Sequence, residues 1–144
     1  MTFSSRGSNL VHGDTNGQTD VFVYDRETQR IQRASVDTGE VEGGGASGDP
    51  TISAGGRFVV FGSSATNLVK NDANGVRDVF IRDLVNGTTR RVSVNSAKEE
   101  GDAGGNNAFL RASGKYVVFQ SGSTNLVAND TNATTDIFLR GPLR

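Results

Sequence analysis

The chain has 144 residues, of which 34% are apolar, 19 are Gly and 2 are Pro, a composition that suits one domain of short elements and tight turns. Its net charge of −1 and pI near 5.8 exclude the strongly basic surface expected of a protein that binds nucleic acid or anionic membranes. The lack of Cys excludes a disulfide framework, a thiolate zinc site and a Cys nucleophile. The apolar runs are too short to cross a bilayer, and the first residues contain no apolar signal-peptide core. We therefore expect neither a nucleic-acid nor a membrane partner.

Nine segments rich in Val, Ile, Phe, Tyr and Thr, bounded by turn residues, predict β-strands. In chain order they cover residues 20–25, 31–36, 49–53, 56–64, 78–83, 89–94, 107–111, 114–122 and 136–141. A further strand is expected at Met1-Thr2-Phe3. No window of helical length shows a 3.6-residue apolar period, so an all-β fold is expected. The runs at 58–61 and 79–81 are apolar at successive positions, which is typical of strands buried on both faces.

The predicted strands belong to a repeat of 58 residues. The motif Asn-Leu-Val begins at Asn9, Asn67 and Asn125, and nine of the 28 positions present in all three copies are identical. Each unit is expected to form four antiparallel strands, and sheets of four strands stacked radially make a β-propeller. The repeat predicts a single partial propeller over 1–144, with about 2.5–3 blades per chain. Blade one (1–48) is expected to be incomplete, blade two (49–106) complete and blade three (107–144) incomplete.

A hairpin "SAGGRFVVF" and a strand "DVFIRD" closed by "NGTT" give the repeat its character. These stretches resemble the blade repeat of TolB-like β-propellers, over essentially the whole chain. The long connection "ATNLVKNDANGVR" and the Gly-rich segment after the fourth strand depart from that pattern. The resemblance implies a scaffold fold rather than an activity, because such propellers include protein-binding modules and non-catalytic domains of peptidases. It also implies an extracytoplasmic location.

Each unit carries the spacing Asp-x-Asn-x-x-x-Asp ahead of its third strand. Carboxylate and amide oxygens are the ligands that Ca²⁺ prefers, so the three loops are candidate calcium sites. The alternative is that the same side chains close Asx-turns and accept backbone N–H groups. Gly17 and Gly75 precede the second Asp by three residues, and Ala133 replaces them in the third copy. The candidate metal ligands are Asp14, Asn16, Asp20, Asp72, Asn74, Asp78, Asp130, Asn132 and Asp136.

No nucleophile–base pattern is recognisable, so no catalytic residue is predicted. We expect a non-catalytic binding or scaffold module, with Ca²⁺ as a candidate cofactor and a protein partner allowed. The alternative is the propeller portion of a larger hydrolase or peptidase whose catalytic residues lie outside this chain. The partial blades predict a homo-oligomer, preferably a dimer that closes a six-bladed ring, or else a five-bladed one; the alternative is a truncated piece of a longer propeller. Phe22, Val23, Phe119 and Phe138 are expected on the exposed terminal faces.

Overall fold

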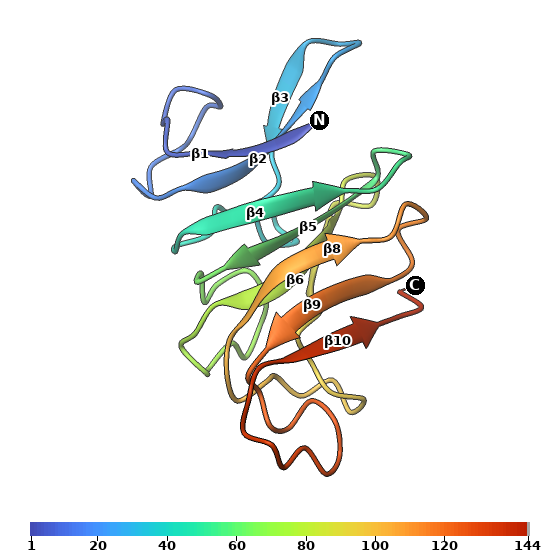
Figure 1. The fold of residues 1–144 in the computed structure, drawn as a ribbon. Coiled ribbons are helices and arrows are strands. Elements are labelled where there is room, and N and C mark those ends of the chain that lie inside the picture. The colour runs from blue at the N-terminus through green and yellow to red at the C-terminus, as the bar shows by residue number, and fades with distance from the viewer. Residues whose placement is uncertain (144) are drawn as a thin grey trace.

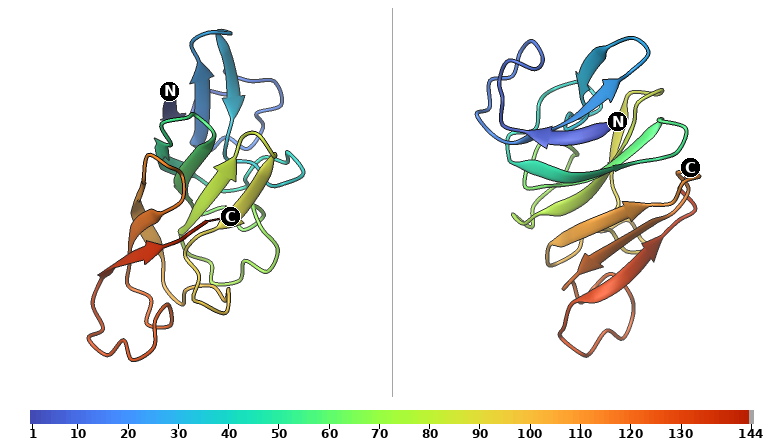
Figure 2. Two further views of the ribbon diagram at one scale, coloured as in Figure 1. Left: turned by 90° about the vertical axis from the view of Figure 1, so that its right-hand side faces the viewer. Right: turned by 45° about the horizontal axis from the view of Figure 1, so that its top comes forward.

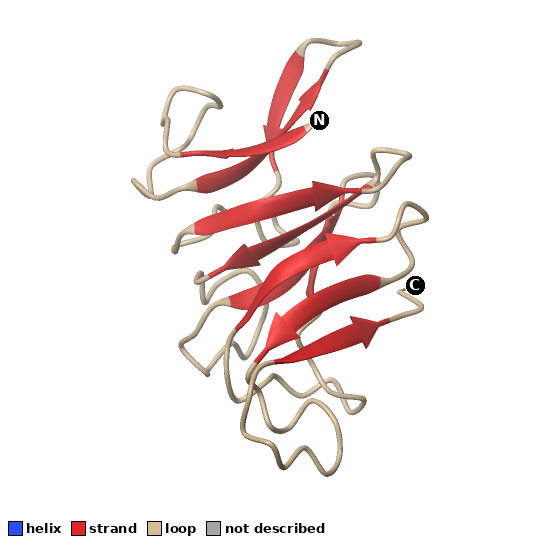
Figure 3. Ribbon diagram, viewed as in Figure 1, coloured by secondary structure: helices blue, strands red, loops and turns tan. Residues whose placement is uncertain are grey.

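The computed structural model describes residues 1–143, and their regular structure consists of ten β-strands (Figures 1 and 3). No helix that could span a membrane occurs in these residues. The strands are β1 (Thr2–Ser5), β2 (Asp20–Asp25), β3 (Arg30–Arg33), β4 (Ser47–Ile52), β5 (Phe58–Ser63), β6 (Asp78–Asp83), β7 (Thr88–Arg91), β8 (Gly105–Leu110), β9 (Val117–Ser121) and β10 (Asp136–Arg140).

The strands form three antiparallel sheets, which we call the first, middle and third blade. Strand orders are β1-β2-β3, β4-β5-β6-β7 and β8-β9-β10, so each blade is a simple meander. The blades follow one another from top to bottom of Figure 1, and the further views in Figure 2 show the same stack. The all-β propeller architecture predicted from the repeat is thereby confirmed.

Every blade has one aromatic face and one aliphatic face, because side chains alternate along a strand. On the aromatic face, two Phe side chains from adjacent strands pair directly and stack. The pairs are Phe3–Phe22, Phe61–Phe80 and Phe119–Phe138, with ring centroids 5.7, 5.9 and 5.6 Å apart. The residues that alternate with these Phe residues along the same strands form the aliphatic face, on the opposite side of the sheet.

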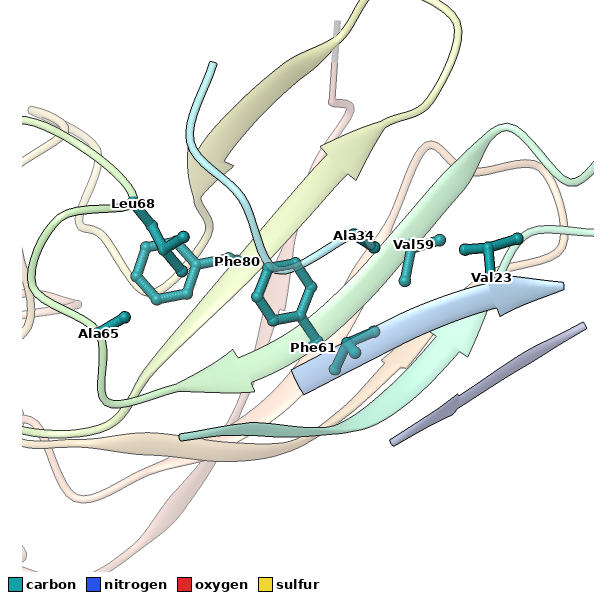
Figure 4. Close-up of a cluster of buried hydrophobic side chains, with 8 residues drawn as sticks. Val23, Ala34, Val59, Phe61, Ala65, Leu68 and Phe80 are labelled. Carbon is teal, nitrogen blue, oxygen red and sulfur yellow. The ribbon is translucent and has the colours of Figure 1, made fainter. Parts of the chain in front are cut away.

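The aromatic face of each blade packs on the aliphatic face of the blade before it. Val21 and Val23 of the first blade belong to one buried cluster with Phe61 and Phe80 of the middle blade (Figure 4). A second cluster joins the middle and third blades in the same way. Its buried members are Val60, Val79, Ile81, Val92, Ala108, Val117, Phe119 and Leu126. The middle blade is therefore buried on both faces, as its uninterrupted apolar runs predicted.

The aliphatic face of the third blade is open to solvent. Phe109, Val118 and Leu139 are paired across β8, β9 and β10, and all three side chains are exposed. Ile137 and Leu139 are 64% and 67% exposed, whereas the equivalent Val79 and Ile81 of the middle blade are 0% and 2% exposed. Burial at these positions is thus supplied by the following blade.

The four residues expected on the terminal faces are not exposed, so that prediction is wrong. Phe22, Val23 and Phe119 are buried, and Phe138 is partly buried in the second cluster. In a strand that is apolar on both faces, the sequence does not distinguish the face that meets the preceding blade from the one that meets the next.

Candidate site at the repeated acidic loops

The three candidate calcium loops connect the second and third strands of the unit. They cover residues 6–19, 64–77 and 122–135, and each ends at an Asp that opens the next strand: Asp20 in β2, Asp78 in β6 and Asp136 in β10. Asp20 and Asp78 are fully buried, whereas Asp136 is only partly buried.

The middle Asn of each motif closes an Asx-turn. In the second loop, Asn74 Oδ1 accepts the Val76 N–H (3.0 Å), and Asn74 Nδ2 donates to Asp78 Oδ2 (3.0 Å) and to the Gly101 carbonyl (3.0 Å). Asn16 repeats all three bonds in the first loop. Asn132 repeats the bonds to Asp136 and to the Thr134 N–H. The Asn in each loop therefore serves turn formation, which was the alternative to calcium binding.

In the first and middle blades, a Ser of the same blade forms a hydrogen bond to the Asp that begins the third strand of the unit. Ser93 donates its hydroxyl to Asp78 Oδ1 (2.6 Å) and accepts the Val79 N–H (3.1 Å). Ser35 makes the same two bonds to Asp20 (2.5 Å) and Val21 (3.1 Å). These bonds satisfy a carboxylate that would be costly to bury without partners.

An arginine from the fourth strand lies among the carboxylates of the first two loops. Arg91 Nη1 is 3.3 Å from Asp78 Oδ2 and 3.8 Å from Asp72 Oδ1, and it also contacts the Glu100 carboxylate. In the first loop, the guanidinium of Arg33 bridges Asp14, Asp20 and Glu42 at 3.8, 3.5 and 2.5 Å. Each of these two loops thus contributes two buried Asp side chains to a cluster of three acids and one base, in which the Glu is partly exposed.

Burial and hydrogen bonding move the pKa values of these acids in opposite directions. Desolvation raises the pKa of Asp72 and of Asp78, and Asp72 Oδ1 is buried without a hydrogen-bond partner. The hydrogen bond from Arg91 lowers the pKa of Glu100. Hydrogen bonds from Thr15, together with Arg33, lower the pKa of Glu42 to about 2.

The residues of the second loop do not fit Ca²⁺ in this arrangement. One oxygen from each of Asp72, Asp78 and Glu100 lies within 4.8 Å of the others, a spacing that suits a single cation. The Arg91 guanidinium already occupies the place between them, and the Asn74 oxygen is bound by a backbone N–H. Calcium binding by the nine candidate ligands stays a prediction from the sequence.

The third loop keeps the same turn without an arginine. Ala133 adopts a φ of 54°, close to the 64° and 66° of the equivalent Gly17 and Gly75, although this conformation is unfavourable for a residue with a Cβ atom. Within residues 1–143, Asp130 and Asp136 form no ion pair, because the fourth strand that supplies Arg33 and Arg91 has no counterpart there.

Sequence reasoning missed the partners that complete the clusters. Arg, Ser and Glu recur at the 58-residue spacing as Arg33/Arg91, Ser35/Ser93 and Glu42/Glu100, so their repetition was available as a signal. They lie 13, 15 and 22 residues after the Asp that opens the strand, on the fourth strand and the segment that follows it.

The Asn of the Asn-Leu-Val motif joins neighbouring blades. Asn67 Oδ1 accepts the Gly44 N–H (2.8 Å), and Asn67 Nδ2 donates to the Glu42 carbonyl (2.8 Å). Asn125 makes the same pair of bonds to the Asp102 N–H (3.0 Å) and the Glu100 carbonyl (2.9 Å). Each blade therefore fastens to the segment that leaves the fourth strand of its predecessor.

The fold of the chain is similar to those of solved protein structures. No protein-family model and no curated protein matches the chain. A TolB structure from Acinetobacter baumannii matches 89% of the chain at 16% identity, with a TM-score of 0.53. The structure of a putative TolB from Agrobacterium tumefaciens matches 89% at 15% identity, with a TM-score of 0.51. The chain spans 25% and 45% of the lengths of these two proteins. The resemblance noted in the sequence is thus confirmed for the fold: the chain has the blade fold of TolB β-propellers.

Proposed function

We propose that the chain is a non-catalytic β-propeller scaffold and binding module, and that it associates with a second copy of itself through the aliphatic face of its third blade. The observation that carries the proposal is the exposed row Phe109–Val118–Leu139, beside Ile137. A contiguous apolar row of this kind is typical of an interaction surface. The acidic loops support the non-catalytic part, because their charged groups are engaged in ion pairs and turn hydrogen bonds.

The packing of the repeat supports a second copy as the partner that covers the open face. At both blade junctions within the chain, the aliphatic face is covered by the aromatic face of the next unit. The chain carries this aromatic face once more, as Phe3 and Phe22 of the first blade. Phe22 is already buried within the chain, as is its equivalent Phe80, whereas Phe3 is only partly buried and Phe61 at the equivalent position is fully buried. A head-to-tail contact between two copies would reproduce the packing of the internal junctions.

Sedimentation equilibrium at micromolar concentration tests this proposal. We expect a mass of twice the 15.2 kDa of one chain. Replacing Ile137 and Leu139 with Glu places charges on the open face and should give the monomer mass with an unchanged circular dichroism spectrum. Val85→Glu is the matched control, because Val85 is 71% exposed in the β6–β7 turn, away from that face. A folded wild-type chain that sediments at 15.2 kDa would contradict the proposal.

A further inference from the structure

Two equivalent grooves lie between the blades, one at each junction. The first groove, of about 690 Å³, lies between β3 and β6, and Arg33 and Arg82 are in its lining. The second groove, of about 570 Å³, lies between β7 and β10, and Arg91 and Arg140 stand at the equivalent positions. The two grooves have the same architecture, so a difference in their lining residues can be read as a difference in what they bind.

The charges of the first groove are balanced internally. Arg82 is almost completely buried; its Nη2 contacts the Glu40 carboxylate, and its Nη1 donates to the Asp37 carbonyl (2.9 Å). Arg33 is paired with Glu42 in the acidic loop cluster. Two cationic and two anionic side chains line this groove, so its net charge is zero.

The second groove replaces the acid opposite the arginine with a lysine. Lys98 stands at the position of Glu40, and both residues have the same left-handed backbone, with φ of 67° and 64°. Both turns are also closed alike, by the Lys98 N–H to the Asn95 carbonyl (3.0 Å) and the Glu40 N–H to the Asp37 carbonyl (3.2 Å). In the first groove, the Glu40 carboxylate neutralises Arg82. In the second groove, the Lys98 side chain starts from the equivalent backbone position and lines the groove together with Arg140.

Two further positions add positive charge to the second groove. Lys70 stands where the first groove has His12, and Arg90 stands where it has Gln32. Among residues 1–143, five cationic and two anionic side chains line the second groove, and their net charge is +3.

The two acids of the second groove are already engaged elsewhere. Glu100 contacts Arg91, and Glu99 accepts a hydrogen bond from Asn95 Nδ2 (2.7 Å). The side chains of Lys70, Lys98 and Arg140 form no ion pair with any residue in 1–143. Three cations gathered in one groove repel one another unless an anion lies between them.

We propose that the second groove binds a compact anion with two or more negative charges, an organic phosphate or a polycarboxylate. Arg140 supplies a planar fork for two oxygens, and Lys70 and Lys98 supply point charges from the walls. Val69, Val94 and Leu143 line the same groove and offer contact to the apolar part of such a molecule. This site is independent of the aliphatic face by which two copies are proposed to meet.

Isothermal titration calorimetry at low ionic strength, with pyrophosphate and citrate as separate probes, tests the site. We expect at least one probe to bind at one site per chain, and binding to weaken as salt is added. The stronger of the two probes identifies the phosphate or the polycarboxylate class. Absence of binding by both would overturn the proposal.

A reciprocal exchange between the grooves provides the variants. Lys98→Glu gives the second groove the charge arrangement of the first, and it should weaken binding by about tenfold or more. Arg26→Glu makes the same change of charge in the exposed turn after β2 and should leave the affinity unchanged. Equal weakening by the two variants would show that the anion responds only to overall charge and would overturn the proposal. Glu40→Lys, which removes the internal partner of Arg82, should raise the number of bound anions per chain above one.

Discussion

The middle and third blades are built from the same 58-residue unit, yet only the middle blade is closed on every side. The middle blade has its fourth strand, a neighbour on each face and an arginine within its acidic loop. Within residues 1–143, the third blade has three strands, a neighbour on one face and an acidic loop without an arginine. The loop and the aliphatic face therefore depend on different partners: the fourth strand of the same unit, β7, supplies the counter-charge for the loop, and the next blade covers the aliphatic face.

The largest expected effect concerns the Asp that opens the third strand of the unit. Asp78→Ala should lower the free energy of unfolding by about 3–5 kcal/mol, because it leaves buried Arg91 with one carboxylate partner fewer, Ser93 without its acceptor and Asn74 with only the Gly101 carbonyl. Asp136→Ala should cost about 1 kcal/mol, because Asp136 accepts only the Asn132 bond in the described chain. Urea denaturation measures both values. Equal costs would mean that the fourth strand does not determine the strength of the loop.

The second comparison tests the cover on the aliphatic face. Ile81→Ala removes a buried side chain of the second core cluster and should cost about 2–5 kcal/mol. Leu139→Ala at the equivalent position should cost less than about 0.5 kcal/mol at protein concentrations low enough to keep the chain monomeric. As the concentration rises, the cost of Leu139→Ala should increase if a second copy covers this face. A large cost at low concentration would contradict the exposure of Leu139.

A smaller difference lies at the end of the third strand. Arg57 forms two hydrogen bonds to Asp83, at 2.9 and 2.7 Å, and these bonds, followed by the backbone N–H groups of Asn86 and Val85, lower the pKa of Asp83 from 3.8 to about 2. The third blade has Lys115 and Gly141 at these positions and cannot form the pair. Because half of the Arg57 side chain is exposed, Arg57→Ala should cost only about 0.5–1 kcal/mol at pH 7, and Lys115→Ala should cost nothing measurable.

The pH dependence of this effect has a definite sign. A carboxylate whose pKa is lower in the folded state stabilises the fold above its ordinary pKa, and the stabilisation is lost as the pH falls toward the folded value. The difference in melting temperature between wild type and Arg57→Ala should therefore be constant above about pH 5, shrink as the pH falls toward 2, and vanish below that value. A difference that stays undiminished down to pH 2 would instead indicate lost packing of Arg57 on Phe58.

The smallest expected effect is that of calcium on the wild-type protein. With Arg91 between the three carboxylates of the second loop, the melting temperature should be the same in EDTA and in millimolar Ca²⁺. Arg91→Ala leaves Asp72, Asp78 and Glu100 without that cation, so Ca²⁺ should stabilise this variant. A rise of several degrees in the wild type would instead support the calcium sites predicted from the sequence.

The sequence predicted the elements that carry strong local patterns. β2 and β6 cover the predicted residues 20–25 and 78–83, since Asp at the start and Asp before the turn mark both ends. β4 begins two residues before the predicted strand, at Ser47, because a bulge between Gly48 and Thr51 accommodates Asp49 at a φ of 53°. A bulge depends on pairing with β5, so it leaves no clear signal in the strand that contains it.

The charged partners were harder to predict than the strands. The Asp-x-Asn-x-x-x-Asp spacing identified the loops, but three side-chain oxygens suit a metal ion and a guanidinium equally well. What separates the two is whether a fourth strand brings Arg33 or Arg91 into the loop, a contact that depends on sheet register. The 15-residue separation of Ser93 from Asp78 has the same origin.

The bonds made by Asn67 and Asn125 have a consequence for how such a protein changes in evolution. In each unit, an Asn side-chain amide forms hydrogen bonds to backbone groups of the preceding unit. The backbone segment after the fourth strand of each unit can form the same bonds with the Asn of the next unit. Because the Asn side chains bind main-chain groups, these hydrogen-bonding groups are retained in most substitutions of the segment. A duplicated unit can consequently form these bonds with both of its neighbours. When a unit is deleted, the two units that become neighbours can still form them with each other.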